Sequence, residues 1–173
     1  GGCYESGHVN GNVVININQD VLKKDVVFQE GTGKSNVDFL SQRDDVETIA
    51  MTVFGAGYGE QSEIWGSTTV NLNNGYAFQV FGGGERGVVG KGTTKSRIVK
   101  DEAGNDVEEF YREYKFDPAY SATITLQGTK TIYSSDGTDP DIPESEYLYA
   151  GGNEANVCGN TYVNLGNGRI YND

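Results

Sequence analysis

Hydrophobic and polar residues alternate with period two in several short segments of the chain, and three of these segments share one pattern. The shared form is V/I-x-G-N/S-x-x-V/I-N-I/L, and it occupies residues 9–17, 64–72 and 157–165. A further copy begins at Val88-Val89-Gly90 and then breaks off. Alternating side chains of an extended chain point to opposite faces, so the pattern predicts β-strands with one aliphatic face and one asparagine face.

The spacing of the copies predicts how these strands are arranged. The motif glycines are Gly11, Gly66, Gly90 and Gly159, and the uninterrupted interval from Gly66 to Gly90 is about 24 residues. An interval of this length fits one turn of a β-solenoid, in which successive turns stack and bury a shared core. The predicted fold class is therefore all-β, a β-solenoid (parallel β-helix) of about three to five rungs with inserted hairpins and loops.

Stacking of equivalent positions about 4.8 Å apart predicts two ladders. The inward ladder takes its aliphatic side chains from the end of each motif, as in Val70 and Leu72. The outward ladder takes the motif asparagines Asn16, Asn71 and Asn164. Residues 122–126 are expected to complete the third rung, with Thr125 in place of an asparagine. Glycines are expected at corners, where a tight turn or a close backbone approach requires them.

The longer intervals predict a single solenoid domain, residues 1–173, with excursions at about 19–50, 91–119 and 134–146. The second excursion predicts a β-hairpin with strands 95–100 and 107–116 and a turn near Gly104-Asn105. A two-residue turn pairs Val99 with Phe110 and places Arg97 opposite Arg112.

One face of the second hairpin strand is a candidate ligand-binding surface. It carries Phe110, Arg112, Tyr114 and Phe116. Two roles are open for this face, a binding platform or a lid packed on the solenoid, and the lid is favoured because exposed apolar patches are unusual.

The third excursion carries the only metal candidate. Asp136, Asp139 and Asp141 offer carboxylates close enough together for Ca²⁺, which takes oxygen ligands. They lack the spacing of an EF-hand loop, so a solvated acidic turn is the favoured interpretation. No other cofactor is expected.

Two glycine-rich segments imitate nucleotide-binding motifs. Residues 82–87 satisfy G-x-G-x-x-G, but Val88-Val89-Gly90 follows where a helix would have to begin. Residues 31–35 end like a P-loop, but Phe28 stands where its first glycine belongs. Neither segment predicts a nucleotide site. His8, the only histidine, is interpreted as a surface residue of the first rung.

Charge narrows the choice of partners. The chain has 25 acidic and 13 basic residues, a net charge of −12, which disfavours nucleic acid and anionic membrane surfaces. No apolar run approaches a membrane span and no signal peptide pattern is present, and both ends are expected to be cuts in a longer polypeptide. Cys3 and Cys158 belong to the first and last rungs, so no disulfide is expected between them.

Catalysis is not expected. The acidic pairs Asp44-Asp45 and Glu108-Glu109 are adjacent along the chain, so their side chains point to opposite faces of a strand. Neither pair can place two carboxylates on either side of one glycosidic bond. No catalytic residue is assigned, although a site assembled across rungs remains open.

The run G-G-N-E-A-N-V-C-G-N-T-Y-V-N-L-G-N-G at residues 151–168 resembles large repeat-built surface proteins of gut anaerobic bacteria. The resemblance covers roughly half of the chain, in the rung segments. It implies a noncatalytic, adhesin-like solenoid that is secreted or at the cell surface and has no cofactor, with host or bacterial surface glycans or proteins as partners. Two alternatives stay open: a carbohydrate-active β-helix enzyme of the polysaccharide lyase or glycosidase type, and a purely structural stalk spacer.

Overall fold

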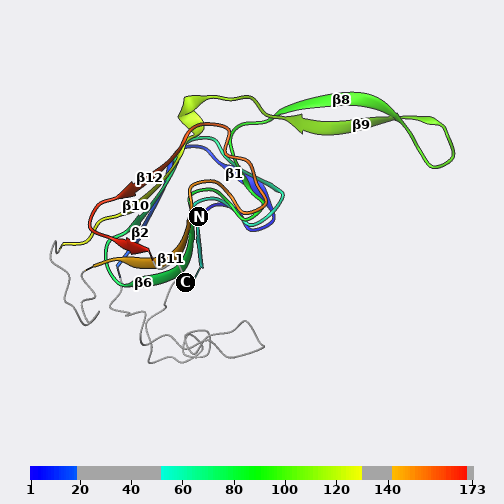
Figure 1. Cartoon of the computed structure of the whole chain (residues 1–173). Coiled ribbons are helices and arrows are strands. Elements are labelled where there is room, and N and C mark those ends of the chain that lie inside the picture. The colour runs from blue at the N-terminus through cyan, green and yellow to red at the C-terminus, as the bar shows by residue number, and fades with distance from the viewer. Residues whose placement is uncertain (19–51, 130–141, 171–173) are drawn as a thin grey trace, which may run out of the picture.

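The computed structural model describes residues 1–18, 52–129 and 142–170, and within these ranges the chain is all-β (Figure 1). Its one helical turn there is the 3₁₀ helix η2 (Pro118–Tyr120), which Pro118 begins and Asp117 caps by accepting from the Ala119 amide. The strands are β1 (Ser6–Val9), β2 (Val13–Ile17), β3 (Thr52–Phe54), β4 (Gln61–Ile64), β5 (Thr68–Leu72), β6 (Tyr76–Phe81), β7 (Val88–Val89), β8 (Thr93–Lys100), β9 (Asp106–Glu113), β10 (Ala122–Leu126), β11 (Glu144–Tyr149), β12 (Thr161–Leu165) and β13 (Arg169–Ile170).

Three sheets are parallel throughout, and together they form what we call the parallel body. The first sheet has the order β1-β4-β7, the second β12-β10-β5-β2 and the third β13-β11-β6-β3. The chain visits them in a repeating order: β4, β5 and β6 belong to the first, second and third sheets, and β7, β10 and β11 repeat the series. The prediction of an all-β fold with parallel strands is confirmed.

The second sheet has the register that the repeated motif predicts. Val70 of β5 pairs with Ile15 of β2 on one side and with Ile124 of β10 on the other. Leu72 likewise pairs with Ile17 and Leu126. Residues 122–126 therefore complete the motif begun at Val88, as expected.

The aliphatic ladder is the core of the body. Val70, Leu72, Ile124 and Leu126 are completely buried, and they pack with residues of the third sheet such as Val80. In β12, which pairs on one side only among the described residues, the equivalent Val163 and Leu165 are exposed.

The asparagine ladder lies on the other face. The Asn71 side-chain amide donates to the side-chain oxygen of Asn16 at 2.8 Å, and Asn164 donates to Thr125 at 3.4 Å. Thr125 thus takes the asparagine position in the third row, as predicted.

Glycine-rich segments connect the third sheet to the first, where chain segments touch backbone to backbone. The Gly55 amide donates to the Phe81 carbonyl at 3.0 Å, and the Gly82 amide donates to the Tyr149 carbonyl at 2.8 Å. A Cβ atom at Gly55 would overlap the Gly82 carbonyl, so the spacing between segments requires glycine. Close approach is the reason for these glycines, as expected.

One motif copy is shifted by a residue from its predicted alignment. Ile64 pairs with Val89 rather than Val88, and Val89 bridges to Val157. Gly90 therefore does not occupy the position of Gly66. It lies beside Cys158 instead, where a Cβ atom on residue 90 would press on the Cys158 thiol.

The second excursion is an antiparallel hairpin of β8 and β9 that projects away from the parallel body (Figure 1). The hairpin was predicted correctly, but its register was not: Val99 pairs with Val107 and Arg97 with Glu109. The cause is the loop, because residues 101–105 all lie outside the strands instead of forming a two-residue turn. Asp101 organises this loop by accepting from the Ala103 and Asn105 amides.

The other two excursions lie largely outside the described residues, which exclude 19–51 and 130–141. The last residues of the third excursion belong to β11, where Glu144 is buried and paired with Arg169 at 3.4 Å.

Candidate functional site

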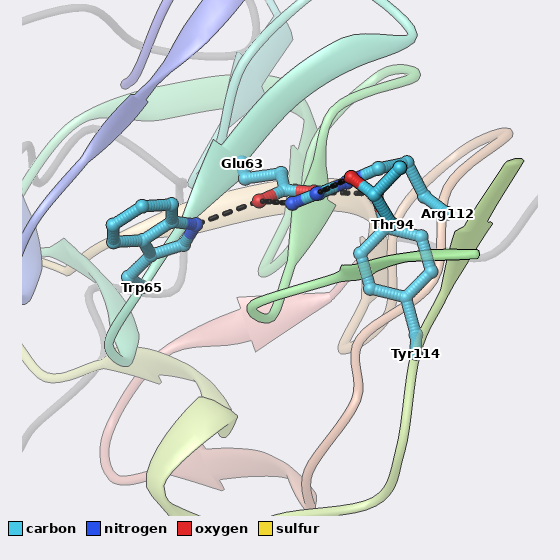
Figure 2. A network of polar contacts seen from close by, with 5 residues as sticks. All are labelled: Glu63, Trp65, Thr94, Arg112 and Tyr114. Carbon is cyan, nitrogen blue, oxygen red and sulfur yellow. Dashed lines mark hydrogen bonds and ion pairs between the residues drawn. The ribbon is translucent and has the colours of Figure 1, made fainter. Parts of the chain in front are cut away.

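The base of the hairpin is joined to the first sheet by one buried carboxylate, that of Glu63 in β4 (Figure 2). The Arg112 guanidinium donates to both carboxylate oxygens, at 2.8–2.9 Å. The Tyr114 hydroxyl donates to Glu63 Oε1 at 2.8 Å, and the Trp65 indole N–H donates to Oε2 at 2.6 Å. We call Glu63, Trp65, Arg112 and Tyr114 the Glu63 cluster.

Strand geometry explains why these side chains meet. Glu63 and Trp65 stand on either side of the inward-facing Ile64, so both point away from the core. Arg112 lies at the base of the hairpin, opposite Thr94, whose hydroxyl accepts from the Arg112 guanidinium at 2.9 Å. The cluster therefore fixes the hairpin where it leaves the body.

The hydrogen bonds set the charge state of Glu63. Burial alone would raise the pKa of this carboxyl, but hydrogen bonds from Trp65, Arg112 and Tyr114 outweigh burial and hold the pKa below its ordinary value. The Tyr114 hydroxyl, one of the three donors, is affected in turn. Burial and the hydrogen bond to Glu63 raise the pKa of Tyr114 to about 12. Glu63 is thus an ionised acceptor, unsuited to act as a general acid at neutral pH.

A cavity of about 480 Å³ opens beside the cluster. It is lined by Gly7, His8, Glu60, Gln61, Glu63, Trp65, Arg112 and Tyr114. Its volume lies within the range of small-molecule sites, and its lining mixes aromatic rings with hydrogen-bonding groups. This combination suits the binding of a polar ligand better than covalent chemistry, because its buried carboxylate is already committed to three donors.

The predicted ligand-binding residues separate into two pairs. Arg112 and Tyr114 come together at Glu63, whereas Phe110 and Phe116 are exposed and take no part in the cluster. Phe110 is not packed on the body as a lid residue would be: Phe110 and Ile98 are each 66% exposed on the same hairpin face, with no part of the described body covering them. Phe116 does not share this face, because β9 ends at Glu113 and Phe116 follows outside the strand.

Sequence reasoning missed Glu63 and Trp65. Trp65 is the only tryptophan of the chain, and it stands two residues from a carboxylate at a variable position of the motif. This spacing could have indicated Glu63 as the acceptor for Trp65, since a buried tryptophan N–H usually finds a hydrogen-bond partner. His8 is a surface residue of β1 as interpreted, but it also stacks on the Trp65 ring with centroids 3.5 Å apart.

Three further predictions concern the acidic cluster, the cysteines and membrane spans. Asp136, Asp139 and Asp141 lie outside the described residues. Cys3 and Cys158 are both free thiols, and burial raises the pKa of Cys158. In the described part of the chain, no helix has the length and apolarity that a membrane crossing requires.

Comparison with known proteins returns no matching family model, no matching curated protein and no matching solved structure.

Proposed function

We propose that the chain is a segment of a noncatalytic, adhesin-like β-solenoid that works at the cell surface or outside the cell and binds ligands through its hairpin and the cavity at the hairpin base. The repeating order of the three parallel sheets supports the solenoid: each series of one strand per sheet is a rung, and equivalent residues of successive rungs pair in register. The resemblance of residues 151–168 to repeat-built surface proteins supports the location.

The observation that carries the binding role is the hairpin itself. It is fixed at its base by Glu63, yet Ile98 and Phe110 remain open to solvent on one face. Soluble proteins rarely keep large apolar side chains exposed together without a partner. A rigid scaffold that presents such a segment is the usual arrangement for recognition.

The state of Glu63 favours binding over catalysis. A carbohydrate-active enzyme needs a pair of carboxylates with separate acid and base roles. Glu63 is held ionised by Arg112, and Glu60, the other carboxylate of the cavity, is open to solvent. The pKa of Glu63 is lowered, which is the opposite of what a general acid requires.

The test is a surface-binding assay with a hairpin-excised variant. Residues 95–111 are replaced by a short Gly-Ser link, which leaves the Thr94–Arg112 pair and the Glu63 cluster in place. Labelled protein is incubated with intact bacterial cells, with epithelial cells and with immobilised matrix proteins. Wild type is expected to bind at least one surface, and the excised variant is expected to lose that binding while melting at nearly the same temperature.

Two double variants refine the assay. Ile98→Ser with Phe110→Ser removes the apolar face, and Val99→Ser with Val107→Ser makes a matched change on the opposite face of the hairpin. The first should reduce binding and the second should not. Wild type that binds none of the surfaces, or an excised variant that binds as well as wild type, would contradict the proposed role of the hairpin.

A further inference from the structure

A second cavity adjoins the first along the outer side of the first sheet. It has a volume of about 520 Å³ and is lined by Tyr4, Glu5, Ser6, Tyr58, Gly59, Glu60, Gln61 and Arg86. Glu60 and Gln61 line both cavities, and we call the two adjoining cavities together the trough. The trough lies on the body, and all of its second half is independent of the hairpin.

Two columns of stacked side chains stand along the trough. In one, Tyr4 stacks on Tyr58 with centroids 5.1 Å apart, and the Arg86 guanidinium lies 5.9 Å from the Tyr58 ring. In the other, His8 stacks on Trp65, and the Lys91 ammonium lies 4.3 Å from the Trp65 ring. Each column thus consists of two rings and one cation, and its three members come from successive turns of the chain.

The core does not explain these columns. The aliphatic cluster behind the first sheet is made by Ala56, Ile64 and Val89. Tyr4 is 72% exposed and Tyr58 is 44% exposed, so their rings contribute little to that cluster. Exposed aromatic rings set along a hollow are a feature of binding surfaces, because they offer large apolar contact area at low conformational cost.

The polar groups between the columns are nearly balanced in charge. Arg86 pairs with Glu154 at 3.3 Å and with Glu60 at 3.8 Å. Arg112 is paired with Glu63. The exposed amide of Gln61 and the carboxylate of Glu60 supply both donors and acceptors, with no surplus of cations to attract an anion.

We propose that the trough between the Tyr4–Tyr58–Arg86 and His8–Trp65–Lys91 columns binds a neutral glycan chain. The neighbours within each column cover the faces of Tyr58 and Trp65, so the C–H groups of sugar rings pack along the exposed edges of the stacked rings. Sugar hydroxyls exchange hydrogen bonds with the Gln61 amide and the Glu60 carboxylate. An acidic glycan would meet the carboxylates of Glu5, Glu60 and Glu154, while Arg86 and Arg112 are already paired with carboxylates and, among the described residues, Lys91 is the one further cation beside the trough. This inference rests on the proposed binding role and names the class of ligand.

A glycan array printed with neutral and acidic oligosaccharides tests the class. Labelled wild-type protein is expected to bind neutral glycans and to leave sulfated, sialylated and uronate glycans unbound. Binding to acidic glycans alone, or to nothing on an array that covers plant, bacterial and animal neutral glycans, would overturn the inference. Titration calorimetry then measures the affinity for the neutral oligosaccharide that gives the strongest signal.

Two variants locate the site. Tyr58→Ala removes one aromatic wall and Gln61→Ala removes the shared amide; both side chains are exposed, so the fold should survive. Each change is expected to weaken binding roughly tenfold. Tyr162→Ala is the matched control, because Tyr162 is a similarly exposed tyrosine on β12 of the second sheet. Unchanged affinity in both trough variants, or equal loss in the control, would contradict the assignment.

The hairpin-excised variant separates this inference from the proposed function. Neutral glycan binding that depends on Tyr58 but is accompanied by no binding to cells or matrix would support the trough and contradict the surface role. Cell or matrix binding that depends on the hairpin and is unaffected by Tyr58→Ala would contradict the trough and leave the surface role intact.

Discussion

The parallel body and the β8–β9 hairpin differ in what stabilises them. In the body, each interior strand is paired on both edges and covers buried side chains, as β5 does between β2 and β10. In the hairpin, each strand is paired on one edge only, and nearly every side chain is exposed. The body therefore depends on burial between successive turns, and the hairpin depends on pairs across its two strands.

That difference explains the role of the Glu63 cluster. A two-stranded hairpin is only marginally stable alone in water. Its exposed ion pairs, Arg97 with Glu109 at 2.6 Å and Lys100 with Asp106 at 2.6 Å, add little. Arg112 and Tyr114 connect the hairpin to a carboxylate that the body holds rigidly, which fixes its direction without burying its faces.

The largest expected effect is in the core of the body. Val70→Asp places an unpaired carboxylate in a fully buried position, so it should lower the free energy of unfolding by more than about 4 kcal/mol and leave the protein unfolded or nearly so. Asn71→Asp is the adjacent control; it removes only a surface hydrogen bond to Asn16 and should cost about 1 kcal/mol. Urea unfolding followed by circular dichroism measures both. Equal losses would show that Val70 does not face the core.

A smaller effect is expected at the hairpin base. The Glu63 side chain is 7% exposed and Arg112 is 41% exposed, so Arg112→Ala leaves a largely buried carboxylate without its cation and should cost about 1–3 kcal/mol. Arg97→Ala removes an arginine from an exposed pair of the same hairpin and should cost less than about 1 kcal/mol. Thermal unfolding of both variants makes the comparison. A larger loss of stability for Arg97→Ala than for Arg112→Ala would show that the Glu63 cluster is not what fixes the hairpin.

The sequence predicted the body much better than the hairpin. A period of two, repeated in equivalent motifs, determines both which side chains face inward and which residues pair, so the rows through Val70 and Leu72 followed directly. The shift at Val88-Val89 was not predictable from the motif, because Val88-Val89-Gly90 matches its letters, whereas the observed pairing of Ile64 with Val89 puts Lys91 at the glycine position. In the hairpin, Gly104 was expected to begin a two-residue turn, whereas it lies inside a longer loop with φ +83°.

The site was the least predictable part. Arg112 and Tyr114 were candidate ligand-binding residues because they share one strand face with Phe110 and Phe116, a face that was expected to be either a binding platform or a lid. Their partner Glu63 is 49 residues away from Arg112 along the chain, and no local pattern encodes such a contact. Only the position of the strand end at Glu113 and the direction of the hairpin bring these residues together.

Acid should weaken the Glu63 cluster before it affects the parallel body. The folded-state pKa of Glu63 lies below its ordinary value of 4.5, so its contribution to stability is present above that pH and is lost as the pH falls through the lower, folded-state pKa. Trp65 donates to Glu63 and is the only tryptophan, so its fluorescence should titrate with a midpoint below 4.5 while the circular dichroism of the body is unchanged. Glu63→Gln should abolish this transition. If the Glu63→Gln variant showed the same fluorescence transition, the transition would belong to another group.

The smallest effect is expected on the exposed hairpin face. Phe110→Ser removes a ring that is open to solvent, so it should change the free energy of unfolding by less than about 0.5 kcal/mol. Thermal unfolding checks this directly. A loss comparable to that of Arg112→Ala would mean that the Phe110 ring is buried in solution.

Amide hydrogen exchange tests most directly whether the body and the hairpin are separate units of stability. The slowest amides should be those of β5, β6 and β10, which are paired on both edges and exchange only through global unfolding. Amides of β8 and β9 beyond the Thr94–Arg112 pair should exchange far faster, through local opening of the hairpin. Hairpin amides as strongly protected as those of β5 would contradict this account, because they would show that the two regions unfold together.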